Sequence, residues 1–180
     1  MIIKRLEEIE EETAIEIAKY MLASMITAPK TRGINDLNVS MVFGDDLKKL
    51  SDKMRSLSKN GDKNFIRDAK SVDDALVVIL IGVKEAKYAG LDCGACGLDC
   101  NGLVDNRRKG KDFYGPICAF KLIDMGIAIG SAVKIASMFN IDNRIMYRVG
   151  VAALQLGQIE GDIALGIPLT IKGKNPFFDR

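Results

Sequence analysis

The sequence predicts an α+β fold in which a small mixed or antiparallel sheet surrounds a long central helix, with a cysteine-rich loop inserted. Three observations predict it. Ala75–Val83 is a continuous aliphatic run rich in β-branched residues, typical of a strand buried on both faces. Ile117–Phe139 is apolar over the length of a long helix and carries several small residues. Shorter helical and strand-like segments flank them without a repeat or linker, so we expect one domain over residues 1–180.

The first third of the chain predicts two helices and a strand. Apolar residues recur with helical spacing over Leu6–Met25, and the early glutamates suit the positive end of a helix dipole. Proline and glycine then break the chain into a loop at Thr27–Asp36. Leu37–Phe43 alternates like a strand, and Asp45 is a suitable N-cap for a helix over Asp46–Ser58.

Further elements are expected on either side of the buried strand and the long helix. A short helix near Asn64–Lys70 precedes the buried strand, and a glycine- and cysteine-rich loop, Gly90–Gly102, follows it. Beyond the long helix, Arg144–Val149 and Asp162–Ile167 have the composition of strands, separated by a short helix over Val151–Leu156.

Charge and hydropathy exclude several classes of function. The formal charge is +2 and the basic residues form no dense stripe, so nucleic acid is not an expected partner. The most apolar segment contains Lys121, Asp124 and Lys134, which a membrane-spanning helix would carry only at considerable cost. We expect Lys121 and Asp124 to face solvent or to pair with opposite charges. The N-terminal residues have no apolar stretch typical of a signal peptide, so we expect a cytoplasmic protein.

The chain contains no histidine. This excludes Ser–His and Cys–His catalysis and histidine-ligated zinc, haem and Rieske centres. Any chemistry must come from cysteines, carboxylates, lysine, arginine, tyrosine or a bound cofactor.

The four cysteines lie in one short segment with the spacing C-x2-C-x3-C-x17-C: Cys93, Cys96, Cys100 and Cys118. Three ligands on a tight loop followed by a distant fourth is a common way for a chain to wrap an iron–sulfur cluster. Glycines between the cysteines let backbone N–H groups point at sulfur. We therefore predict a 4Fe–4S cluster bound within residues 90–118.

Other uses of the four thiols remain open. A zinc ion held by all four is the main alternative, although such sites usually use two C-x2-C pairs and this chain has one. Thiol redox chemistry is a further alternative, whereas structural disulfides are not expected in a chain without an export signal.

Four stretches of the chain carry a family resemblance: Ile26–Leu37, Leu91–Gly102, Gly115–Ala153 and Ala164–Arg180. Together they resemble a prokaryotic family of uncharacterised ferredoxin-domain-containing proteins. The cysteine stretch is also similar to a four-cysteine 4Fe–4S domain of electron-transport and corrinoid-protein subunits. That domain more often has four residues between its second and third cysteines, where this chain has three.

A second resemblance involves a helix that leads into the loop Ala28–Asn35 and a strand, the helical segment Asp124–Ala128, and the late segment Leu165–Pro168. These resemble the fold of FMN-dependent nitroreductases. The resemblance implies a homodimer, with the small-residue helix at the interface and FMN between the subunits.

The candidate flavin-binding residues come from the same resemblance. Nitroreductases usually begin with an Arg-Arg-Ser-x-Arg segment that binds the FMN phosphate, and this chain has Lys4-Arg5-Leu6-Glu7 instead. Arg32, Lys172 and Lys174 are then candidates to supply positive charge, or else they belong to solvated loops. Asn35 is a candidate to hydrogen-bond a flavin or substrate, or else an ordinary turn residue.

Two functions follow from these observations. The first is an iron–sulfur oxidoreductase or electron carrier, with a redox partner or a small-molecule substrate and a flavin pocket at a dimer interface. The alternative is an interaction module without catalysis, in which zinc or a cluster only stabilises the loop that binds a partner.

Overall fold

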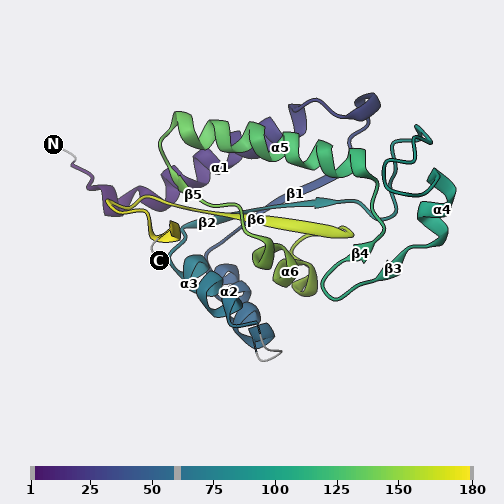
Figure 1. The fold of residues 1–180 in the computed structure, drawn as a ribbon. Helices are drawn as coiled ribbons and strands as arrows, with labels where there is room; N and C mark the ends of the chain where they lie inside the picture. The colour runs from purple at the N-terminus through teal and green to yellow at the C-terminus, as the bar shows by residue number, and fades with distance from the viewer. Residues whose placement is uncertain (1–2, 59–61, 179–180) are drawn as a thin grey trace.

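A four-stranded antiparallel sheet forms the centre of the computed structural model, which describes residues 3–58 and 62–178 (Figure 1). The strand order is β1–β2–β6–β5, and the strands are β1 (Leu37–Phe43), β2 (Val77–Val83), β6 (Ile163–Thr170) and β5 (Asp142–Asn143). Each neighbouring pair is antiparallel. The predicted α+β class is therefore confirmed.

Helices cover both faces of this sheet (Figure 1). One face carries α1 (Glu10–Thr27) and α5 (Ala119–Met138). The other face carries three shorter helices: α2 (Asp45–Ser58), α3 (Asn64–Asp73) and α6 (Tyr147–Leu156). The two helical layers create two hydrophobic cores, one on each side of the sheet.

Strand β2 belongs to both cores. All seven of its residues are buried. Ile79 and Ile81 pack against α1 and α5, while Val78 and Leu80 pack among α2, α3 and α6. Successive side chains of a strand point to opposite faces, so a strand covered on both sides must be apolar throughout. The uninterrupted aliphatic run predicted this position correctly.

The long helix α5 lies on the sheet and is not buried all round. Its inner face, including Ala128 and Ala132, packs in the core with α1. Its outer face is apolar but exposed, with Ile123 52% and Ile127 40% accessible. Because both faces of α5 are apolar, its sequence does not reveal which face packs on the sheet.

The predicted strand Arg144–Val149 is wrong. A single bridge joins Met146 to Gly166, and helix α6 begins at Tyr147. A Cβ atom on Gly150 would lie 1.9 Å from the Ala164 carbonyl oxygen, and one on Gly166 would lie 2.2 Å from Val149 Cγ1. These glycines let α6 pack directly on β6, and that close packing is a tertiary feature that strand propensity does not reveal.

The remaining elements are short. They are η1 (Leu6–Glu8), η2 (Thr31–Gly33), α4 (Cys100–Asp105), β3 (Arg108–Lys109), β4 (Tyr114–Gly115) and η3 (Pro176–Phe178). Helix α4 and the β3–β4 hairpin lie inside the cysteine-rich insertion between β2 and α5. The sequence predicted a loop over Gly90–Gly102 and no helix or strand between that loop and the long helix. No helix within the described residues is long and apolar enough to cross a membrane.

Candidate metal centre

The cysteine-rich insertion lies at one end of the sheet, where β2 ends, β1 begins and β6 begins (Figure 1). Cys93 and Cys96 lie in its loop, Cys100 is the first residue of α4, and Cys118 is the N-cap of α5. All four cysteines line one cavity. We call this the cysteine cavity. The structure thus brings the four predicted ligands together, although they span two helices and a loop.

The cysteine cavity has a buried floor and an exposed rim. Ala89, Leu103 and Cys118 form a small buried cluster beneath it, whereas Cys93 is exposed. The cavity is narrow, about 10 Å³, which is room for roughly one water molecule. Across residues 3–58 and 62–178, no three cysteine, aspartate or glutamate side chains converge tightly enough to hold a single metal ion.

Backbone geometry shapes the loop between the cysteines. Gly94 and Gly97 have φ values of 68° and 85°, which a residue with a Cβ atom rarely adopts. The Gly97 N–H donates to the Gly94 carbonyl at 2.8 Å, and the Cys96 thiol donates to the Leu98 carbonyl at 3.6 Å. The Cys100 N–H donates to the Asp92 carboxylate at 2.9 Å, which ties the start of α4 to the loop.

Asp162, the residue before β6, joins the beginning of the insertion to its middle. Its buried carboxylate accepts a hydrogen bond from the Ala86 N–H at 2.7 Å and pairs with the Arg107 guanidinium. This pairing raises the pKa of Arg107. The Asp162 backbone also bonds to Val83 and Tyr114. Sequence reasoning missed this residue, because the partners of its side chain, Ala86 and Arg107, are more than fifty positions away.

A buried charge cluster lies one helical turn beyond Cys118. Lys121 is 1% exposed, and its ammonium lies 2.9 Å from Asp36 and 3.4 Å from Asp124. Asp124 also accepts hydrogen bonds from the Thr31 N–H and hydroxyl, both at 2.8 Å. The expectation that Lys121 and Asp124 pair with opposite charges is confirmed, while neither faces solvent. The cluster ties the first turns of α5 to the loop before β1.

Lys30 completes the surroundings of this cluster. Its ammonium donates to three carbonyls at the end of α1, those of Met25, Ile26 and Ala28. Burial lowers the pKa of Lys30, Asp124 opposes that shift, and Lys121 adds to it.

The four candidate flavin residues do not form one site within a single chain. Arg32 and Asn35 precede β1, whereas Lys172 and Lys174 follow β6 at the opposite end of the sheet. Arg32 donates to the carbonyls of Ala89 at 3.3 Å and Gly90 at 3.4 Å, just before the cysteine loop. The Asn35 side chain accepts from the Leu37 N–H at 3.4 Å, as a turn residue does.

Solved structures similar to this one include nitroreductases. An FMN- and NADPH-dependent nitroreductase from Sphigopyxis sp. strain HMH aligns with a TM-score of 0.60 at 11% identity, over 92% of this chain and 83% of that one. A nitroreductase with bound FMN from Desulfitobacterium hafniense aligns with a TM-score of 0.58 at 12% identity, over 88% and 78%. At such identities the likeness shows the fold, and the predicted nitroreductase-like fold is confirmed.

Sequence comparison identifies closer relatives. An uncharacterized protein of Archaeoglobus fulgidus is 46% identical over 168 residues, which cover 92% of this chain and 91% of that protein. Residues 114–180 match the model of a family described as uncharacterized proteins containing a ferredoxin domain. That match includes Cys118 and begins after the other three cysteines. The chain belongs to this ferredoxin-domain family.

Proposed function

We propose that this chain is a cytoplasmic iron–sulfur redox protein, an oxidoreductase or electron carrier, whose cluster is bound by its four cysteines. One observation carries the proposal: Cys93, Cys96, Cys100 and Cys118 line a single cavity although two helices and a loop contribute them. Membership of a ferredoxin-domain family and the nitroreductase-like fold support a redox role.

The donor set suits a cluster better than zinc. A zinc ion needs all four sulfurs about 2.3 Å from one point. A 4Fe–4S cluster gives each cysteine its own iron atom, so it accepts thiolates spread around the wall of a cavity. Binding requires the narrow cavity to widen. The loop can do so because Cys93, Gly94 and Gly97 are exposed and no atom lies within 4 Å of a Cβ position on either glycine.

The chain's own residues prepare this cavity for a negatively charged group. Cys118 sits at the N-terminal end of the twenty-residue helix α5, where the helix dipole is positive and stabilises a thiolate. Ala89 and Leu103 exclude water from its floor. A bound cluster would supply one-electron transfer, with a potential that depends on its burial and on hydrogen bonds to sulfur.

The proposed redox unit is a homodimer that also binds FMN. The exposed apolar face of α5 is the proposed contact with a second copy. Because Arg32 and Asn35 lie at the opposite end of the sheet from Lys172 and Lys174, a flavin that uses both pairs must take them from different subunits. Arg32 also contacts the segment before Cys93, so a flavin there would lie near the cysteine cavity.

The decisive experiment is anaerobic purification followed by an absorbance spectrum and analysis of iron, sulfide and zinc on one sample. We expect iron and sulfide with a broad band near ~400 nm, as four thiolates and a cluster produce. Resolved flavin peaks would support the FMN part. Stoichiometric zinc without iron in a colourless protein would overturn the cluster proposal and favour a zinc-stabilised interaction module.

A matched pair of variants tests the ligand assignment. Cys96→Ser should lose iron or leave a defective cluster, because a hydroxyl is a much poorer iron ligand than a thiolate. Ala95→Ser places the same hydroxyl one residue away and should keep the wild-type iron and sulfide content. Equal iron content in Cys96→Ser and wild type would rule out Cys96 as a ligand.

A further inference from the structure

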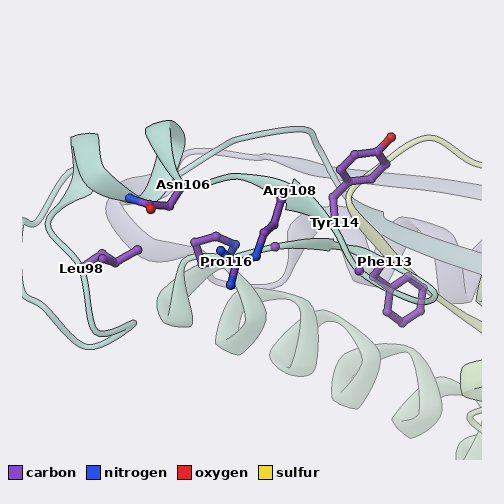
Figure 2. A pocket seen from close by; sticks show the side chains of 8 residues that line it. Leu98, Asn106, Arg108, Phe113, Tyr114 and Pro116 are labelled. Carbon is purple, nitrogen blue, oxygen red and sulfur yellow. The ribbon is translucent and has the colours of Figure 1, made fainter.

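A second, larger pocket lies beside the cysteine cavity, next to α4 and the β3–β4 hairpin (Figure 2). Its volume is about 500 Å³, within the range of pockets that bind small molecules. We call it the Arg108 pocket. Leu98 lines both this pocket and the cysteine cavity, so the two lie next to each other. A molecule bound here would lie next to the proposed cluster.

Arg108 gives the pocket an available positive charge. Its side chain is exposed and, among the residues that the structure describes, has no hydrogen bond or ion pair. The neighbouring Arg107, by contrast, is engaged by Asp162 and by Glu85 at 3.3 Å. In Figure 2 the Arg108 guanidinium points toward Pro116 on the pocket wall. A planar guanidinium with free donors binds carboxylates and phosphates in a bidentate manner.

The nearby carboxylate of Asp112 is already engaged. It accepts a hydrogen bond from the Tyr147 hydroxyl. Partial burial and this contact with Asp112 raise the pKa of Tyr147 to about 12, so its hydroxyl stays a donor at neutral pH. Among the described residues Asp112 is thus engaged by Tyr147 and forms no ion pair with Arg108, whose charge is left for a ligand.

The rest of the pocket is suited to an apolar molecule. Leu98, Phe113 and Pro116 provide hydrophobic surface around the guanidinium. The Phe113 ring is held edge-on against Tyr147, with ring centroids 5.2 Å apart. Asn106 is positioned by donating to the Gly102 carbonyl at 2.8 Å. A cation within apolar walls selects a ligand that combines a negative group with a hydrophobic body.

We infer that the Arg108 pocket binds a small organic anion, a carboxylate or phosphate group attached to an apolar body about the size of one ring. Its role as a substrate or effector of the redox centre rests on the proposed function. The binding itself does not, because every residue that carries it lies outside the cysteine ligand set.

The test is ligand-observed saturation-transfer NMR on anaerobically purified protein. The probes are benzoate, phenyl phosphate and two incomplete analogues, benzyl alcohol without the charge and acetate without the ring. Benzoate or phenyl phosphate should bind saturably and more tightly than either analogue, and the tighter of the two identifies the anionic group. Arg108→Gln should weaken that binding about tenfold or more, as the loss of a charge-assisted contact does.

Two further variants complete the design. Lys109→Gln removes the same charge from the next residue of β3, whose side chain points to the opposite face of the hairpin, and should bind like wild type. Arg108→Lys keeps the charge without the planar fork and should fall between wild type and Arg108→Gln. Equal losses in Lys109→Gln and Arg108→Gln, or no saturable binding to wild type, would overturn the inference.

Iron and sulfide assays on the same samples separate this inference from the proposed function. If none of the samples contains iron, the wild-type protein included, the cluster proposal fails. The titrations then still decide whether the pocket binds an anion. If iron is present and benzoate and phenyl phosphate bind no better than the analogues, the cluster proposal stands and the pocket inference is overturned.

Discussion

Lys121 shows how a single residue connects the cysteine cavity to the sheet. It lies one helical turn beyond Cys118, and its buried ammonium forms ion pairs with two carboxylates, those of Asp36 and Asp124. Removing water from charged groups is costly. If one member of such a cluster is lost, the remaining charges are buried without a partner, and the protein is destabilised. The cost of removing Lys121 alone should therefore exceed the net contribution of the whole cluster to stability.

Replacing Lys121 with methionine should destabilise the protein strongly. The variant removes the direct ion-pair partner of two buried carboxylates, a change that typically costs about 3–5 kcal/mol of unfolding free energy. Urea denaturation measures the loss. The double variant Lys121→Met/Asp124→Asn should recover part of it, because an amide oxygen can still accept the hydrogen bonds from Thr31.

Lys134→Met is the matched control for this comparison. Lys134 lies on the same helix but is exposed, so its loss should change stability by no more than about 0.5 kcal/mol. A Lys121→Met variant as stable as Lys134→Met would show that the buried cluster does not depend on its cation.

The sequence reveals residues that act through local spacing and misses those that act over long distances. The four cysteines lie within 26 positions, so their spacing alone predicted a shared site. Asp36 and Lys121, or Arg107 and Asp162, are separated by more than fifty positions and meet only because the sheet brings their segments together. Nothing in either neighbourhood identifies the partner.

At the scale of elements, the cysteine-rich insertion depends on Asp162 for its closure. The carboxylate contacts both Ala86, at the beginning of the insertion, and Arg107, just before β3. The same anchoring fixes the position of Arg108, the next residue along the chain. We therefore expect the order of the insertion to depend on one buried side chain, that of Asp162 just before β6.

Asp162→Asn should loosen the insertion while leaving the sheet and its two cores intact. The amide keeps the shape of aspartate but loses the charge that holds Arg107, and a hydrogen bond to a charged group contributes about 1.5–3 kcal/mol. Tryptic cleavage at Lys87 and Arg107 should accelerate about tenfold or more. The rate is read by gel and mass spectrometry, with circular dichroism to confirm the fold.

Asp105→Asn serves as the control, since Asp105 is exposed on α4 within the same insertion. It removes an identical charge and should leave the cleavage rate unchanged. Acceleration of equal size in both variants would mean that net charge, and not the Asp162 contacts, governs the order of the insertion.

Helices and strands could be predicted from the sequence where the spacing of the apolar residues matches the residues that the fold buries. β1 was predicted over the residues it occupies, and β2 followed from its aliphatic run. Helix α4 and the β3–β4 hairpin were missed, because glycine- and cysteine-rich sequence carries no hydrophobic period and these elements depend on capping by Asp99 and on contact with β6. Helix α6 was assigned partly to a strand, because β-branched residues there serve helix–sheet packing.

At the scale of the whole molecule, the outer face of α5 remains without a partner within the described chain. Ile123, Ile127 and Met138 lie along it, with Met138 70% exposed. Gly126 and Gly130 lie on the same face, and nothing in the chain comes within 4 Å of a Cβ position on either. At its end, Tyr20 of α1 stacks on Phe139 with ring centroids 6.1 Å apart. This face is largely apolar, although the exposed Lys134 lies on it between Gly130 and Met138. An exposed apolar surface of this kind is typical of a protein–protein interface.

The homodimer proposal predicts that a charge on this face separates the subunits. Ile123→Glu should convert a dimer into a monomer in sedimentation velocity at micromolar concentration, because pairing two copies would bury unpaired carboxylates. Ile66→Glu is a close control: Ile66 is also 52% exposed, but it lies on α3, beyond the opposite face of the sheet. It should remain dimeric.

The same experiment separates the interface from the flavin. If the FMN site takes Arg32 and Asn35 from one subunit and Lys172 and Lys174 from the other, monomeric Ile123→Glu should lose bound flavin yet keep iron, because all four cysteines belong to one chain. If the monomeric variant also loses its iron, cluster binding in the cysteine cavity depends on the dimer interface. A wild-type monomer would leave the apolar face of α5 to a different partner and would remove the basis for a flavin shared between subunits.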